Sequence, residues 1–131
     1  MTPVTWQRAE SVALAAAFAL AGPVAFGYAW WWPLVLFLAF DLSALGYVGG
    51  TRAGATLYNA GHNYIGPVLA AGAFALTSAD ALMILALAWG FHVAVDRGLG
   101  YGLKLPDDFQ HTHLGWIGRA RTPAGEHAEG A

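Results

Sequence analysis

The sequence predicts an all-α, polytopic membrane protein, built as a four-transmembrane-helix up-down bundle with a short amphipathic cytoplasmic tail. Of its 131 residues, 57% are hydrophobic and only 11% are charged, whereas charged residues make up about 25% of a typical soluble domain. Four stretches approach the ~20 apolar residues that a helix needs to cross a bilayer. We therefore expect a single membrane domain over residues 1–118, with the lipid bilayer as its main partner.

The four predicted spans follow one another closely along the chain. The first continues into the aromatic cluster Tyr28 to Trp32, which is typical of a membrane interface and favours a retained span over a cleaved signal peptide. The connections are short and rich in turn residues, as at Gly49-Gly50-Thr51, so consecutive helices should run antiparallel. The predicted spans cover residues 9–27, 31–49, 53–76 and 79–98.

The positions of the basic residues predict the orientation. If the amino terminus is cytoplasmic, both outer connections lack Lys and Arg, and every basic residue lies on the inner side, as the positive-inside rule requires. We therefore expect a multi-pass inner (plasma) membrane protein with both termini in the cytoplasm. The basic residues are Arg8, Arg52, Arg97, Lys104, Arg119 and Arg121.

Ionisable residues inside the predicted spans are costly in hydrocarbon and are therefore candidates for function. At about 1.5 Å per helical residue, Asp41 and His62 should both lie about 14 to 15 Å from the inner interface and meet near mid-membrane. His92 should lie nearer the cytoplasm, at a depth of about 7 to 8 Å, with Asp96 on the same helix face and Glu10 at the same end. The sequence thus predicts a polar site in the cytoplasmic half of the bundle.

The segment after the last span combines apolar residues with two histidines, His111 and His113. Its aromatic and aliphatic side chains predict that residues 99–118 lie against the inner face of the bundle and cover the polar site. Residues 119–131 are small and polar, and we expect them to be disordered.

Several short motifs together resemble the bacterial membrane proteins of the domain-of-unknown-function family numbered 4260. The resemblance extends over about residues 8–118 and implies an architecture and a set of polar motifs, but no reaction. It also ranks His113 above His111 as a functional candidate. The motifs are Glu10, Asp41-Leu42-Ser43 with Gly46-Tyr47, Tyr58-Asn59 with His62, His92 with Asp96-Arg97, Gly100 to Lys104, and Phe109 with Thr112 to Gly115.

The first functional hypothesis is a metal site. Imidazole and carboxylate ligands suit a divalent transition metal such as zinc, iron or manganese, and an open coordination position would allow hydrolysis. A loose likeness to membrane-bound metal-dependent hydrolases points the same way. The candidate ligands are His62, His92 and His113 with Asp41, Asp96 and Glu10.

Two alternatives remain open at this stage. Asp41 and His62 could handle a proton or a small solute without a metal, which in so small a bundle would require a homo-oligomer. The polar groups could also only specify helix packing, with Tyr47 and Asn59 as hydrogen-bonding supports. Arg97 and Lys104 are candidates for contact with lipid headgroups or an anionic small molecule. Neither the formal net charge of -2 nor any basic patch favours nucleic acid, and a chain without cysteine has no thiolate ligands.

Overall fold

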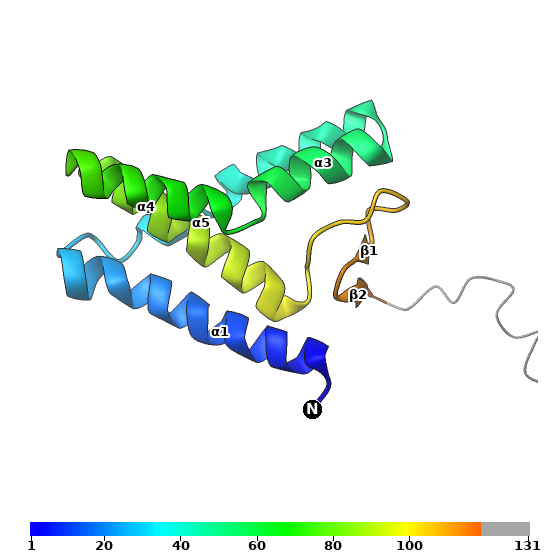
Figure 1. The fold of residues 1–131 in the computed structure, drawn as a ribbon, viewed down its shortest axis with the longest axis horizontal. Helices are drawn as coiled ribbons and strands as arrows, with labels where there is room; N and C mark the ends of the chain where they lie inside the picture. The colour runs from blue at the N-terminus through cyan, green and yellow to red at the C-terminus, as the bar shows by residue number, and fades with distance from the viewer. Residues whose placement is uncertain (119–131) are drawn as a thin grey trace, which may run out of the picture.

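The computed structural model describes residues 1–118, and this part of the chain is mostly helical (Figure 1). The predicted disordered segment 119–131 lies outside the described residues. In chain order the elements are α1 (Pro3–Ala21), η1 (Gly22–Phe26), α2 (Trp32–Val35), η2 (Phe37–Gly49), α3 (Thr51–Gly61), α4 (Ile65–Thr77), α5 (Asp80–Leu99), β1 (His111–Thr112) and β2 (Gly115–Trp116).

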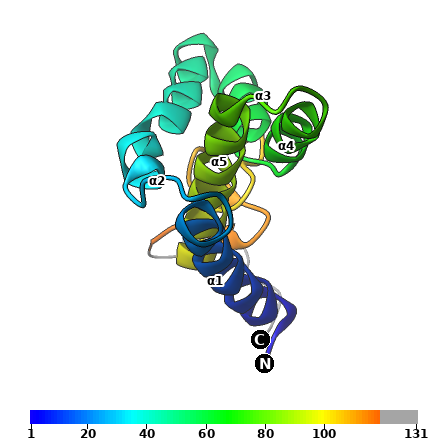
Figure 2. The ribbon, with the colours of Figure 1, turned by 90° about the vertical axis from the view of Figure 1, so that its left-hand side faces the viewer.

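Helix α5 lies at the centre of the fold, and α1, α2, η2 and α4 all pack against it (Figures 1 and 2). Small residues allow this close approach, as they commonly do between membrane helices. Ala88 and Ala94 are fully buried, and Gly90 leaves room for the ring of Phe18 on α1. The core is therefore a set of close helix contacts around α5.

The helices connect at two opposite ends of the molecule (Figure 1). At one end, the hydroxyl of Tyr28 donates to Asp80 Oδ1 at 2.7 Å and joins the two connections on that side. At the other end, Arg8 Nε donates to the carbonyl of Gly98 at 3.0 Å and joins the start of α1 to the end of α5. Consecutive segments therefore run between the two ends in alternating directions.

Three helices are long and apolar enough to cross a membrane: Pro3–Phe26, Trp32–Gly49 and Asp80–Leu99. Many large apolar side chains on these helices and on α4 are exposed, among them Val48 and Leu76. An apolar exterior of this kind matches a lipid environment. These features indicate a membrane protein.

The third predicted span is not one continuous helix. It divides into α3 and α4 at residues 62–64, and the two halves lie at an angle to each other (Figure 1). The freed backbone groups have new partners: Asn63 Nδ2 donates to the carbonyl of Asn59 at 2.7 Å, and Asn63 Oδ1 accepts from the amide of Ile65 at 2.8 Å. Trp89 Nε1 donates to the carbonyl of Gly61 at 2.6 Å. Such replacement partners make a helix break tolerable away from water.

The second predicted span is mainly a 3₁₀ helix, η2, where an α-helix was expected. With three residues per turn, every third side chain falls on the same face. Leu42, Leu45 and Val48 form one exposed apolar face. Asp41 and Ala44 lie on a second face and line a cavity. The 3₁₀ pitch thus separates the apolar exterior from the polar interior over thirteen residues.

The remaining face of η2 packs tightly on α3 through small residues. Gly46 lies against Leu57, and Gly61 lies against Ser43. Gly54 of α3 lies under the ring of Tyr47, where a Cβ atom would collide with the ring carbons. Close contact between η2 and α3 therefore depends on glycine at these positions.

Residues 99–118 pack back onto the bundle, as predicted, but as an irregular segment with a small β-hairpin. Strands β1 and β2 pair antiparallel, and Lys104 forms a bridge with Thr112. The backbone amide of His113 donates to the carbonyl of Leu103 at 2.9 Å. The side chain of Asn59 on α3 pairs with both backbone groups of Lys104, at 2.6 Å and 2.9 Å. The segment is therefore fastened to α3 at one point.

A pair of glycine substitutions tests the contact between η2 and α3. We expect Gly54→Ala to lower the free energy of unfolding by about 1–3 kcal/mol, because the new methyl group overpacks the ring of Tyr47. Gly72→Ala in α4 is the control, since nothing lies within 4 Å of the added methyl group, and it should be neutral or stabilising by up to about 1 kcal/mol. Thermal unfolding in detergent measures both. Equal effects of the two substitutions would contradict the described contact.

The histidine of the hairpin makes the docking of residues 99–118 pH-dependent. His113 Nδ1 accepts from the amide of Leu103 at 2.8 Å, so the bond needs an unprotonated Nδ1. Desolvation and the positive charge of Arg97 hold the pKa of His113 below its usual value. A lowered folded-state pKa stabilises the fold above the unfolded pKa of about 6.5, and this contribution is lost as the pH falls.

We therefore expect the hydrogen-exchange protection factor of the Leu103 amide to be lower at pH 5 than at pH 7.5. His113→Gln should remove most of this pH dependence, which separates the effect from titration elsewhere. The same change with pH in wild type and variant would show that His113 is not responsible.

Candidate metal centre

Four ionisable side chains from three elements meet in the interior of the protein. Asp41 comes from η2, His62 follows the end of α3, and His92 and Asp96 lie one turn apart on α5. Each presents one nitrogen or oxygen atom, and these four atoms all lie within 4.8 Å of one another. The structure thus brings together four of the six ligand candidates from the sequence.

The five separations in this cluster that include a histidine nitrogen are close to those of tetrahedral coordination. Four ligand atoms at about 2.0–2.1 Å from a zinc-sized ion lie about 3.3–3.4 Å apart. Nε2 of His62 lies 3.4 Å from Asp41 Oδ1 and 3.4 Å from Asp96 Oδ2. Nε2 of His92 lies 3.5 Å from the same two oxygens. The two Nε2 atoms are 2.9 Å apart, which corresponds to an angle of about 90° at such an ion.

The surroundings of His62 direct its Nε2 into the cluster. Nδ1 lies 2.9 Å from the backbone carbonyl of Tyr58, one turn earlier in α3. A carbonyl only accepts, so Nδ1 carries the proton and Nε2 of the neutral ring presents a lone pair. The ring also stacks on that of Tyr58, with centroids 3.7 Å apart. A histidine oriented in this way through its second nitrogen is the usual arrangement of a metal ligand.

His92 is held by aromatic packing. Its side chain is fully buried, and its ring lies between Phe37 and Phe40, with centroid distances of 4.5 Å and 5.5 Å. Its Nδ1 has no hydrogen-bond partner among residues 1–118, so the Nε2 that faces the cluster makes its polar contacts. Four residues later Asp96 lies on the same face of α5, as the spacing predicts, and accepts from the Tyr58 hydroxyl at 3.2 Å.

The cluster borders a cavity through its carboxylates. The two histidines are buried, whereas the side chain of Asp41 is 44% exposed. Asp41 and Asp96 both line a cavity of about 420 Å³ between η2, α3, α5 and residues 101–117. Catalytic metal sites characteristically keep such an open side, whereas structural sites are enclosed by protein ligands.

The depth order expected from the sequence is only partly correct. Asp41 and His62 meet as expected. His92 was expected nearer the cytoplasmic end, but it lies level with His62, because their Nε2 atoms are in contact. The estimate assumed parallel α-helices, whereas η2 rises faster than an α-helix and α3 is inclined to α5 (Figure 1).

Glu10 and His113 are not in the cluster. Glu10 is exposed on α1, and the neighbouring Ser11 is the residue of this helix that faces inward. His113 supports the hairpin: Nδ1 accepts from Leu103, and Nε2 lies 3.4 Å from Gln7 Nε2. His111 is also separate, since its Nδ1 pairs with Asp107 at 2.7 Å.

The predicted supporting residues have different roles. The side chain of Asn59 holds the backbone of Lys104, while its backbone carbonyl accepts from the amide of His62 at 3.3 Å. Tyr47 packs on Phe109, and its buried hydroxyl has no partner within residues 1–118. Arg97 lies over the ring of Tyr64 at 4.7 Å from the centroid, on another side of α5.

Lys104 lines the same cavity as Asp41 and Asp96. The spacing of residues along the sequence did not predict this position. It is only 4% exposed, and its ammonium group lies 4.1 Å from the ring centroid of Phe109 and 4.9 Å from that of Tyr58. Burial lowers the pKa of Lys104, and the negative charge of Asp96 acts in the opposite direction. The sequence marked Lys104 as a basic residue in the Gly100 to Lys104 motif and as a candidate for contact with an anion, but it did not place Lys104 beside the cluster.

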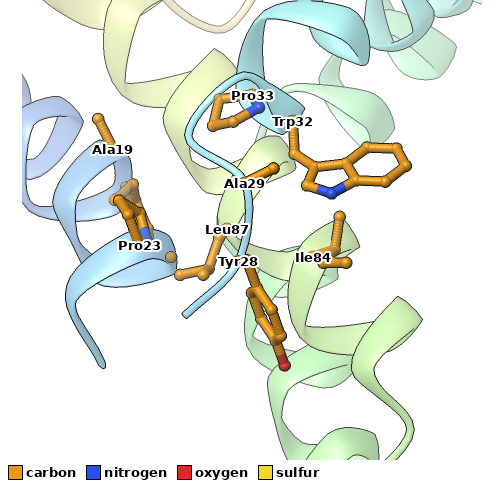
Figure 3. Close-up of a pocket in the computed structure, with 10 residues that line it drawn as sticks. Ala19, Pro23, Tyr28, Ala29, Trp32, Pro33, Ile84 and Leu87 are labelled. Carbon is orange, nitrogen blue, oxygen red and sulfur yellow. The ribbon is translucent and has the colours of Figure 1, made fainter. Parts of the chain in front are cut away.

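A second pocket lies at the opposite end of the molecule and has a different character. Figure 3 shows the side chains around it, which include Trp32, Ile84 and Leu87. It encloses only about 10 Å³ and its lining is almost entirely apolar. It offers no ionisable group besides the phenol of Tyr28, which is paired with Asp80. The chemistry of the described chain is therefore concentrated at the His and Asp cluster.

Comparison with known proteins gives a family but no activity. Searches of curated proteins and of solved structures find no match to this chain. One family model does match, and it covers residues 4–117, which include all the described elements that form the cluster and its cavity. The chain belongs to the family described as Domain of unknown function (DUF4260).

Proposed function

We propose that this protein is a metal-binding protein of the bacterial inner membrane, with one divalent transition metal held by Asp41, His62, His92 and Asp96. One observation carries the proposal. Four ligand atoms from three separate elements face a common point, at separations of 2.9–3.5 Å for the five pairs that include a histidine nitrogen. Two imidazoles and two carboxylates suit zinc, iron or manganese.

Charge and protonation support a metal over a purely structural network. Two carboxylates in a largely apolar interior carry two negative charges that need compensation. In a network without metal, the Nε2 proton of His92 would bind the Nε2 lone pair of His62, whose own proton is committed to the carbonyl of Tyr58, so neither imidazole proton would remain for the carboxylates. One divalent cation balances both carboxylates and accepts the lone pairs of both Nε2 atoms. Without the metal, only the Tyr58 hydroxyl among residues 1–118 donates a hydrogen bond to either carboxylate, to Asp96 at 3.2 Å.

We propose metal-assisted hydrolysis as the reaction class. With four protein ligands in place, a divalent ion would take up water only as a fifth ligand, and it would then supply a hydroxide nucleophile at neutral pH. The chain contributes the exposed side of Asp41 and a cavity of about 420 Å³ next to it. Tyr58 supports Asp96 from the same cavity wall. Substrate would therefore enter from the side of residues 101–117.

The proposed topology has four crossings with both termini in the cytoplasm. The third crossing consists of α3 and α4 and is broken at His62, as is common where a membrane protein builds a polar site. Arg8, Arg97 and Lys104 belong to the same end of the molecule as the docked segment 99–118. The positive-inside rule assigns this end to the cytoplasm.

Metal content tests the proposed ligands directly. We expect wild-type protein, purified in detergent without chelator and then supplied with zinc, to retain about one metal per chain. His62→Ala and His92→Ala should each lose nearly all of it, because three ligands remain and a carboxylate is left unpaired. His113→Ala is the matched control and should keep the metal, since His113 lies outside the cluster. Inductively coupled plasma mass spectrometry measures all four proteins. A metal-free wild type, or loss in His113→Ala alone, would overturn the assignment.

Thermal stability separates a metal site from a metal-free network. A ligand that binds only the folded state adds about 2.7 kcal/mol when its free concentration is 100 times the dissociation constant. We therefore expect a chelator to lower the thermal midpoint of wild type and added zinc to restore it, with little response in Asp96→Asn. If chelator and zinc leave the wild-type midpoint unchanged, the cluster is a hydrogen-bonded network.

A further inference from the structure

The cavity beside the cluster contains a positive charge that the metal site does not use. Lys104 enters it from the docked segment, and its backbone is fixed by the two hydrogen bonds from Asn59. The other walls come from η2, α3, α5 and the hairpin region. The lining residues are Asp41, Ala44, Tyr58, Asp96, Tyr101, Lys104, Phe109, Gln110 and Ile117.

The ammonium group of Lys104 has no acceptor within the described chain. It forms neither an ion pair nor a side-chain hydrogen bond with any residue in 1–118. The rings of Phe109 and Tyr58 hold it instead, at 4.1 Å and 4.9 Å from their centroids. An ammonium carries three donors, and burial without acceptors is costly. The residue is only 4% exposed and lines the cavity, so the acceptors of its ammonium group are the water or the ligand that fills the cavity.

The sign of the charge that fits depends on the metal, so this step rests on the proposed function. Asp41 and Asp96 contribute two negative charges, which one divalent ion neutralises. Because Lys104 adds one positive charge, the cavity then has a net charge of about +1. With the metal bound, the cavity attracts an anion; without it, the two carboxylates outnumber the lysine and repel one. Lysine is also a common ligand of phosphate, as a compact point charge.

The mouth of the cavity combines polar and apolar groups. Tyr101 and Phe109 line the cavity and are also 42% and 47% exposed. Tyr101 follows the exposed Leu99, the last residue of a candidate membrane span, and lines a neighbouring pocket with it. The amide of Gln110 and the phenol of Tyr101 add neutral hydrogen-bonding groups. This mouth can accept a ligand whose phosphate lies inside and whose apolar part stays near the membrane surface.

We propose that the cavity binds a phosphate monoester or diester, with its phosphate group between Lys104 and the metal held by the cluster. The phosphate can belong to a lipid headgroup that enters along the membrane surface or to a soluble ester from the cytoplasm. Both sources share the chemistry that Lys104 recognises. In either case the phosphate lies next to the open side of the metal site, where the proposed hydrolysis would take place.

Phosphate binding to metal-loaded protein tests this proposal. Isothermal titration with inorganic phosphate and with glycerol phosphate is carried out in an uncharged detergent, on protein whose metal content has been measured. We expect binding to metal-loaded wild type and at least a tenfold loss of affinity in Lys104→Met, since charge-assisted hydrogen bonds contribute about 1.5–3 kcal/mol. Arg52→Met removes an exposed cation at the start of α3 and is the matched control. It should bind phosphate like wild type.

A second measurement needs only wild type and serves if Lys104→Met does not fold. Phosphate binding is measured before and after chelation of the metal, and we expect chelation to abolish it. Nanodiscs of phosphatidylcholine with and without phosphatidic acid distinguish the two sources. Competition by phosphatidic acid against inorganic phosphate indicates a lipid headgroup, and tight binding of glycerol phosphate without such competition indicates a soluble ester.

Some results would overturn the phosphate site. They are metal-loaded wild type that binds no phosphate from either source, equal affinity in Lys104→Met with its metal retained, or binding that persists after chelation. The first two leave the metal centre intact. Failure of the metal centre is recognised separately, from wild type that contains no metal.

Discussion

The structure depends on one electrostatic constraint: two carboxylates and two imidazoles must share a small volume inside an apolar protein. Isolated charges in such surroundings cost several kcal/mol each, so the cluster is stable only if its members compensate one another or share a cation. The five separations that include a histidine nitrogen, 2.9–3.5 Å, fit a shared cation. Much of the unusual backbone in the molecule serves to bring these four side chains together.

Two departures from regular α-helix create the cluster. The break between α3 and α4 places His62 at the end of α3, where its Nδ1 can bind the carbonyl of Tyr58. Asn63 and Trp89 satisfy the backbone groups that the break releases. The 3₁₀ helix η2 keeps Asp41 and Ala44 on the cavity side while its apolar face stays outward. Local irregularity is thus concentrated where the polar chemistry is.

The sequence was sufficient for the helical class and for two of the pairings within the cluster, between Asp41 and His62 and between His92 and Asp96. Apolar length and helical spacing determine these features. It was not sufficient for the helix break, because hydropathy over residues 53–76 hides the turn at Asn63 that tertiary hydrogen bonds stabilise. Glu10 and His113 were misplaced because sequence position gives depth but not the direction in which a side chain points. The position of Lys104 in the cavity could not be predicted, because it depends on hydrogen bonds between its backbone and the distant residue Asn59.

The central claim is that these four side chains hold one metal ion, and anomalous diffraction from crystals of the zinc-loaded protein tests it most directly. The account predicts a single strong anomalous peak at the zinc edge, about 2.0–2.2 Å from Nε2 of His62 and Nε2 of His92, with carboxylate oxygens of Asp41 and Asp96 completing the coordination. A peak at His111 or His113 instead, or no peak at the cluster in crystals soaked with zinc, would contradict it.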